Sequence, residues 1–124
     1  MLARHGPSVA ILWPPNHKLV PVTILGVANA TLRIDRIVQD EPTSGLGDGN
    51  TCPDGLGVGI STAELRAERS GEGDGRIYTI FFTAIDRGGG SAVGSVRVAV
   101  PHDRAHQAID SGTAFDSTAC PVSR

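Results

Sequence analysis

The chain has 124 residues, 40% of them hydrophobic and 19% charged, so it suffices for one folded domain and is too short for two of ordinary size. Eleven basic and thirteen acidic residues give a net charge of −2 with no Lys/Arg cluster, which excludes nucleic acid as a partner class. No apolar stretch approaches the roughly 20 residues of a membrane span, so we expect no transmembrane segment.

Short strands are predicted along the first third of the chain, because the apolar runs are separated by many of the 16 glycines and 8 prolines. The three candidates are residues 8–13 (SVAILW), 19–27 (LVPVTILGV) and 31–39 (TLRIDRIVQ). Pro21 has no backbone donor, so its strand is expected at a sheet edge or at a bulge.

The middle of the chain combines a long loop with an ambiguous segment. Residues 43–59 are rich in Gly, Asp, Asn and Pro, and a loop of this length is expected to be functional or disordered. Residues 61–69 (STAELRAER) alternate, with Ala63, Leu65 and Ala67 on one face and Glu64, Arg66 and Glu68 on a solvated face. We predict a strand here. A short helix is the alternative, because Ala, Glu, Leu and Arg favour helices.

The clearest strand is residues 76–86 (RIYTIFFTAID), in which Tyr78, Ile80, Phe82 and Ala84 point to one side. Both of its faces are apolar enough for a central strand. A Gly88–Gly90 turn joins it to residues 94–100 (GSVRVAV), which predicts a hairpin. After Val100 the chain becomes polar and is expected to form a tail. Several short strands without a convincing helix predict an all-β fold of the sandwich type.

The run RIYTIFFTAIDRGGGSAVGSVRVAVPHD resembles the last two strands of bacterial immunoglobulin-like domains of the HYR, PKD and fibronectin type III kind. The pieces LWPPNHKLVPV, QDEP, GDGNTCPD, LRAERSGEGDGRIYTI and VPHD together resemble a module of secreted and surface-attached bacterial proteins. The resemblance implies an exported, non-catalytic module. Its fold would be an immunoglobulin-like β-sandwich of about seven strands over residues 8–103, with a polar tail over 104–124. Tyr78 would be the corner tyrosine, with its ring in the core and its hydroxyl on a backbone group.

Two cysteines bear on the compartment. Cys52 and Cys120 are far apart and form no CxxC motif, which excludes a zinc ribbon and a thioredoxin-like site. One disulfide between them would pin the tail to the domain and stabilise the fold by roughly 4 kcal/mol in an oxidising compartment. Two free thiols are the alternative. The first residues lack the apolar centre of a signal peptide, so the chain is either cytosolic or part of a longer exported protein.

A shared end of the sandwich is expected to gather the polar residues. Strands run alternately up and down, so residues 13–18, residues 40–41 with the long loop, and residues 102–103 would lie at one end. Carboxylate and amide oxygens suit Ca²⁺. The predicted calcium ligands are Asp40, Glu41, Asp48, Asn50, Asp54 and Asp103. The alternative is that Asp, Asn and Gly serve here only as turn formers in a solvated loop.

Other chemistry has weaker support. His17 and His102 with a carboxylate would suit a transition metal, but no local spacing favours that site over histidines that bond backbone groups. The chain has no Gly-x-Ser-x-Gly, no His-Glu-x-x-His and no phosphate-binding loop, so we expect no enzyme. Trp13, His17 and His102 are the candidate ligand contacts.

We therefore predict a non-catalytic, extracellular or cell-surface spacer of a bacterial protein, with a structural or adhesive role and calcium as a stabilising ion. Its partners would be neighbouring domains of the larger exported protein, with a glycan or a cell-surface protein as a further partner. The alternative from another class is a carbohydrate-binding accessory module of a secreted hydrolase, which would stack a sugar on Trp13. A small metal-dependent enzyme using His17 and His102 is the third hypothesis.

Overall fold

The structure is a computed structural model that describes residues 5–27, 29–41, 53–69, 75–101, 103, 108 and 114–119. These residues form strands and no helix. The strands are β1 (Gly6–Pro7), β2 (Leu19–Leu25), β3 (Ala30–Gln39), β4 (Gly55–Leu56), β5 (Thr62–Arg66), β6 (Arg76–Asp86), β7 (Ser91–Val100) and β8 (Phe115–Asp116).

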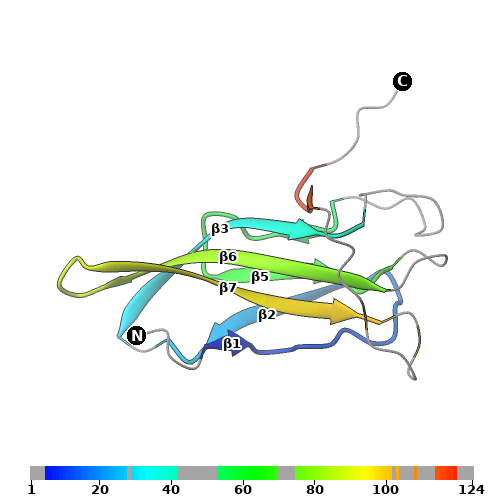
Figure 1. Cartoon of the computed structure of the whole chain (residues 1–124), viewed down its shortest axis with the longest axis horizontal. Coiled ribbons are helices and arrows are strands. Elements are labelled where there is room, and N and C mark those ends of the chain that lie inside the picture. Colours follow the sequence, from blue (N-terminus) through cyan, green and yellow to red (C-terminus); the bar gives the residue numbers. More distant parts are fainter. Residues whose placement is uncertain are drawn as a thin grey trace.

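The strands form two antiparallel sheets of four strands each (Figure 1). One sheet has the order β1-β2-β5-β4 and the other the order β7-β6-β3-β8. The all-β, sandwich-like fold that the sequence predicts is confirmed at this level. The count of about seven strands is not confirmed, because the described residues hold eight and three of these have only two residues.

Five predicted strands are observed as β2, β3, β5, β6 and β7. Residues 62–66 are a strand, so the helix alternative for this segment is wrong. Pro21 pairs only with Glu64 of β5, while β1 pairs with β2 at Ile24 and Leu25, so the proline lies where β2 is an edge. Pro21 has no backbone N–H to donate, but at this open edge no hydrogen bond of the sheet requires one.

The predicted strand at residues 8–13 is wrong as a continuous strand. Gly6–Pro7 pairs with β2 of one sheet, and Ile11 then forms a parallel bridge with Ala99 of β7 in the other sheet. The N-terminal stretch thus crosses between the sheets. Local alternation cannot reveal this change of partner, because it depends on pairing with a strand far along the chain.

The core lies between the sheets and follows the alternation of the strands. Tyr78, Ile80, Phe82 and Ala84 of β6 are fully buried, as the alternation predicts. They pack in one cluster with side chains from both sheets, including Leu12, Val22, Leu65 and Val98. Each large apolar side chain buried in this way contributes about 1.5–3 kcal/mol relative to its exposed state.

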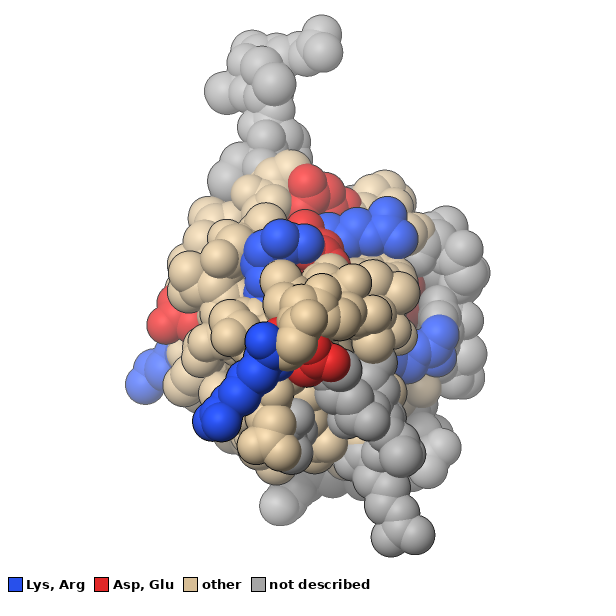
Figure 2. Space-filling view, turned by 90° about the vertical axis from the view of Figure 1, so that its left-hand side faces the viewer, with Lys and Arg blue, Asp and Glu red and all other residues tan. Residues whose placement is uncertain are grey.

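The two ends of the fold differ in character. We call the end with the β6–β7 turn (residues 87–90) and Leu25 the hairpin end, and the end with Leu19, Gln39 and Arg76 the polar end. In Figure 1 the hairpin end lies on the left. Figure 2 looks onto that end, where basic and acidic side chains are interspersed and neither sign dominates the visible face.

A short connection links the two sheets along the side of β3. Gly59 N donates to Ile34 O, and Ile34 N donates to Ile60 O, both at 2.8 Å. The register of β3 against β6 shifts between Ile34 and Arg36, which leaves Asp35 as the extra residue of a β-bulge. The connection therefore bonds to β3 just where its ladder is interrupted.

Candidate functional site

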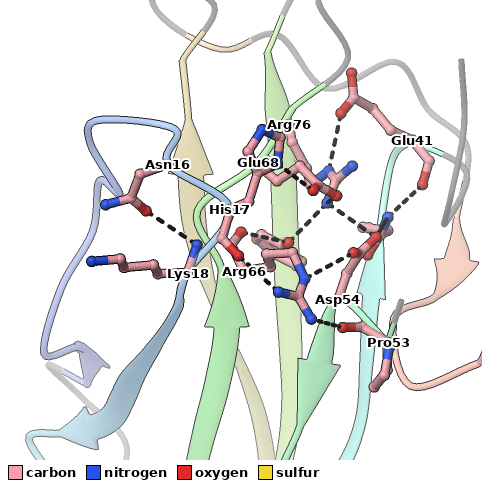
Figure 3. Close-up of polar contacts among 11 residues, drawn as sticks. Asn16, His17, Lys18, Glu41, Pro53, Asp54, Arg66, Glu68 and Arg76 are labelled. Atoms are coloured by element: carbon pink, nitrogen blue, oxygen red, sulfur yellow. Dashed lines mark hydrogen bonds and ion pairs between the residues drawn. The ribbon is translucent and has the colours of Figure 1, made fainter. Parts of the chain in front are cut away.

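A buried arginine organises the polar end. Arg76 is two residues before Tyr78 on the core-facing side of β6, so the alternation of the strand turns it inward, and it is fully buried. Its Nε lies 3.0 Å from Glu41 Oε1, and its Nη1 lies 3.1 Å from Asp54 Oδ2 and 3.7 Å from Glu68 Oε1 (Figure 3). Three carboxylates from three different segments thus surround one guanidinium.

Tyr78 extends this network into the core. Its hydroxyl accepts a hydrogen bond from Arg76 Nη1 at 2.9 Å and donates one to the backbone oxygen of Arg66 at 2.8 Å. The expected buried ring with its hydroxyl on a backbone group is confirmed, and the corner-tyrosine role implied by the resemblance stays a prediction. Burial raises the pKa of the Tyr78 phenol, with the Arg76 charge opposing it, so the hydroxyl stays neutral and keeps its proton for donation.

The carboxyl of Asp54 has a strongly raised pKa. It is fully buried, and Gln39 Nε2 donates to its Oδ2 at 2.9 Å and to Glu41 O at 2.8 Å. Burial raises the pKa of Asp54 to about 6, although the Arg76 charge and the Gln39 hydrogen bond both act to lower it. Nearby Glu68 raises this pKa further.

Arg66 is a second arginine that joins two segments. Its Nη1 donates to His17 O at 2.7 Å and its Nη2 donates to Pro53 O at 2.8 Å. Its Nε lies 3.6 Å from Asp54 Oδ1, so the guanidinium also faces that carboxylate. A planar guanidinium with several fixed donors suits this task, because one side chain can bridge acceptors on separate loops.

The turn before β2 brings His17 to the same cluster. His17 has a φ of 65°, a left-handed conformation that is uncommon for residues other than glycine. Its N donates to Ala67 O at 3.0 Å, and Ala67 N donates to Lys18 O at 2.9 Å, which hold the turn against the end of β5. His17 Nδ1 lies 2.6 Å from Oε2 of Glu68, with the imidazole 49% exposed and the glutamate fully buried.

We call these eight residues the Arg76 cluster: Gln39, Glu41, Asp54, Arg66, Glu68, Arg76, Tyr78 and His17. They come from the turn before β2, the end of β3, the approach to β4, the end of β5 and the start of β6. The solvated position expected for Glu68 is wrong. The strand ends at Arg66, so the alternation no longer applies to Glu68, and this side chain turns inward to Arg76 and His17.

The predicted calcium ligands are only partly brought together. Glu41 and Asp54 both contact Arg76, and Asp40 Oδ1 accepts a hydrogen bond from Ile77 N at 2.8 Å. Within the described residues, no group of three His, Cys, Asp or Glu is placed to hold a metal ion. Asp48 and Asn50 lie outside the described residues, and Asp103, partly buried, follows the end of β7. The calcium site stays a prediction.

Of the remaining candidate residues, some are described by the structure and others lie outside the described residues. Trp13 is 36% exposed and directly follows Leu12, which is buried in the core. Cys52, Cys120 and His102 lie outside the described residues, so the disulfide and the paired-histidine site stay predictions. The turn with His17 and the segment with Glu41 do meet at one end, as the alternating strand directions predict.

Sequence reasoning missed Arg66 and Arg76, which hold the cluster together. One signal was present for Arg76. The alternation that places Tyr78, Ile80 and Phe82 inward also places Arg76 inward when it is extended by one step. A charged residue at such a position needs buried partners, and acidic residues before β4 and after β5 were the candidates.

We found no match to the chain among protein-family models, curated proteins or solved structures. The described residues include no apolar helix long enough to cross a membrane.

Proposed function

We propose that the chain is a non-catalytic spacer of a bacterial extracellular or cell-surface protein, and that it carries tension along its long axis between neighbouring domains. An immunoglobulin-like topology is part of the proposal. The order β1-β2-β5-β4 in one sheet, with β7, β6 and β3 in the other, supports this topology. The chain crosses between the sheets from β2 to β3, from β3 to β4 and from β5 to β6, as it does at the corresponding strands of that fold.

The observation that carries the proposal is the parallel contact between the N-terminal stretch and β7. Ala99 N donates to Ala10 O, and Leu12 N donates to Ala99 O, both at 2.9 Å. Leu12 is buried in the core beside this contact. The first part of the chain is therefore bonded to the end of its last long strand.

The direction of these bonds decides how the fold responds to force. The N-terminal stretch and β7 both run from the hairpin end to the polar end. Tension would pull the start of the chain beyond the hairpin end and the end of β7 beyond the polar end. This tension loads the bonds at Ala99 in shear, so they must break together instead of one after another.

The positions of the short outer strands agree with this role. β1 pairs with β2 at Leu25, at the hairpin end, whereas β8 pairs with β3 at Gln39, at the polar end. The ten residues of β3 between these ends span about 30 Å at the usual rise per residue. Domains attached before β1 and after β8 would lie at opposite ends of the module.

The Arg76 cluster supports the same proposal by closing the polar end. It joins five segments with charged and hydrogen-bonded contacts, and its central arginine is fully buried. Such a cluster positions chain segments and offers a substrate no access to its guanidinium. We therefore assign it a structural role.

Single-molecule stretching of the chain through its two ends tests the proposal. We expect one unfolding peak in the wild type and a clearly lower peak force in Ala99→Pro, because proline removes the donor to Ala10. Val93→Pro is the matched control. Val93 lies on the same edge of β7 at the hairpin end, and the structure gives its N–H no partner among the described residues. Equal forces in both variants would contradict the proposal.

Calcium stabilisation stays a prediction within this proposal, for ligands that include Asp48 and Asn50. A comparison of the melting temperature with and without calcium tests this prediction.

The second candidate function, carbohydrate binding by an accessory module, is favoured by one observation: Trp13 is partly exposed on a turn whose backbone is hydrogen-bonded at His17 and Lys18. Loss of glycan binding in Trp13→Ala would support it.

A further inference from the structure

The outward face of β3, β6 and β7 carries an exposed arginine, Arg36, that packs against an aromatic ring. Arg36, Phe81 and Ser95 lie side by side across the three strands in the observed register. The Arg36 guanidinium lies 4.2 Å from the centre of the Phe81 ring, in a cation–π contact that holds it over the ring. Arg36 is exposed, and it forms no ion pair with any residue that the structure describes.

The neighbouring carboxylate does not neutralise Arg36. Asp35, on the bulge, accepts hydrogen bonds from Thr83 Oγ1 at 2.6 Å and Arg33 Nε at 3.1 Å. The hydrogen bond from Thr83 lowers the pKa of Asp35 against its slight burial, and Arg33 lowers it further, so Asp35 is ionised and paired with Arg33. No carboxylate among the described residues therefore pairs with Arg36, and its guanidinium is accessible to a ligand.

The whole face is positive although the chain is negative. The charged residues of β3, β6 and β7 on this face are Arg33, Asp35, Arg36 and Arg97, with a formal charge of +2. Asp116 of β8 lies opposite Val38 on the same face and lowers this to +1, against −2 for the chain. Around Arg36 and Phe81 lies a shallow, open hollow of about 420 Å³. Its other lining residues are Asp35, Phe82, Val93, Gly94 and Ser95.

We propose that this face binds a carboxylate-bearing polysaccharide, with Arg36 as its anion contact. A guanidinium fixed on a ring offers its N–H edge to a carboxylate in the bidentate geometry that arginine favours. The open hollow suits an extended polymer, because sites for small molecules enclose most of the ligand. Exposed Ser95 offers a hydroxyl to sugar hydroxyls, and Val93, which is 76% exposed, offers apolar surface to a sugar ring.

An acidic protein segment fits this face less well. β6 is bonded on both sides, to β3 and to β7, so a peptide strand cannot pair beside Phe81. Among the described residues the outer edge of β7 is open at Val93, but Arg36 lies on β3, two strands away from that edge. The proposal is also independent of the tension-bearing role. It places the ligand on the outward face of one sheet, away from the Ala99 bonds and from Trp13.

Binding of polygalacturonate at low salt tests this inference, with dextran as the neutral polymer. We expect the wild type to bind polygalacturonate and not dextran. Arg36→Gln should weaken binding by about tenfold, the loss typical of one charge-assisted contact. Arg87→Gln is the matched control, because Arg87 is exposed in the β6–β7 turn and its removal changes the net charge equally. This control should change binding by less than about twofold.

Three results would overturn the inference. They are no binding of polygalacturonate by the wild type, equal weakening by the two variants, and equally tight binding of poly-glutamate. The second would mean diffuse attraction by net charge, and the third would mean that any polyanion suffices. Arg36 is on the surface, so both variants should melt at the temperature of the wild type, which shows that a loss of binding does not arise from unfolding.

Discussion

At the scale of single residues, the burial of Arg76 dominates the polar end. A guanidinium without solvent is stable only with charged partners, and Glu41, Asp54 and Glu68 supply them. The stabilisation is mutual, because each of these buried carboxylates also has Arg76 as a positive partner. Removal of the arginine therefore takes the shared positive partner from three carboxylates at once.

We expect Arg76→Met to lower the free energy of unfolding by about 3–5 kcal/mol, the usual penalty for breaking a buried ion pair from one side. Methionine has a similar length, so the loss would arise from charge and not from a cavity. Urea denaturation measures it. Arg87→Met, exposed in the β6–β7 turn, should stay within about 0.5 kcal/mol of the wild type. A loss below about 1 kcal/mol in Arg76→Met would refute the structural role of the cluster.

Asp54 gives the polar end a pH dependence. Its pKa is about 6 in the folded protein and near 3.8 in the unfolded chain, so the folded state holds the proton more tightly. The Asp54 contribution to stability is therefore full below about pH 4 and is lost as the pH rises through 6. We expect the free energy of unfolding to fall between pH 5 and pH 7 by more in the wild type than in Asp54→Asn, in which this titration is absent.

Denaturation series at several pH values measure this difference. The window from pH 5 to pH 7 also avoids the titration of Asp35. That residue has a lowered pKa, so its contribution is lost only as the pH falls below its usual range near 3.8. Equal slopes in wild type and Asp54→Asn would show that Asp54 does not carry a raised pKa.

Residue patterns predicted the core better than the cluster. The alternation of β6 identified Tyr78, Ile80, Phe82 and Ala84 as buried, because one strand decides the facing of its own side chains. The carboxylate partners of Arg76 come from three other segments, so no local pattern contains them. Three calcium candidates, Asp40, Glu41 and Asp54, were correctly identified as lying near one end, but the arginines beside them were not.

At the scale of elements, the connection between β4 and β5 depends on one glycine. Gly57 has a φ of 115°, and a Cβ there would lie 2.3 Å from the backbone oxygen of Thr62. Backbone atoms cannot yield as a flexible side chain does. The same connection then supplies Gly59 and Ile60 to the hydrogen bonds with Ile34.

We therefore expect Gly57→Ala to destabilise the fold by more than about 1 kcal/mol, because both conformation and space oppose the added methyl group. Gly59→Ala is the matched control. Gly59 also has a positive φ, 92°, but a Cβ there meets nothing within 4 Å. Thermal unfolding of the two variants separates the effects. A Gly59→Ala loss as large as that of Gly57→Ala would mean that conformation alone matters.

Strands whose apolar and polar residues alternate were predicted, and the short strands that exist only by pairing with a neighbouring strand were not. β2, β3, β5, β6 and β7 all lie within or across predicted segments. The two-residue strands β1, β4 and β8 have no period of their own and exist through their partners in the sheet. The change of sheet between Pro7 and Ile11 was missed for the same reason.

At the scale of the whole molecule, the tension-bearing role depends on the parallel direction of the N-terminal stretch and β7. The N-terminal stretch and β7 are bonded in parallel, so a load applied between opposite ends of the fold shears these bonds. A load applied at the hairpin end alone would instead peel them one at a time. The same protein should therefore resist the two loads differently.

Single-molecule stretching in two geometries measures this difference most directly. In the first geometry the chain is held by its two ends, and in the second by its N-terminal end and an attachment point introduced at Gly88 in the β6–β7 turn. The tension-bearing account predicts a clearly higher unfolding force in the first geometry. Equal forces, or a higher force in the second geometry, would contradict it.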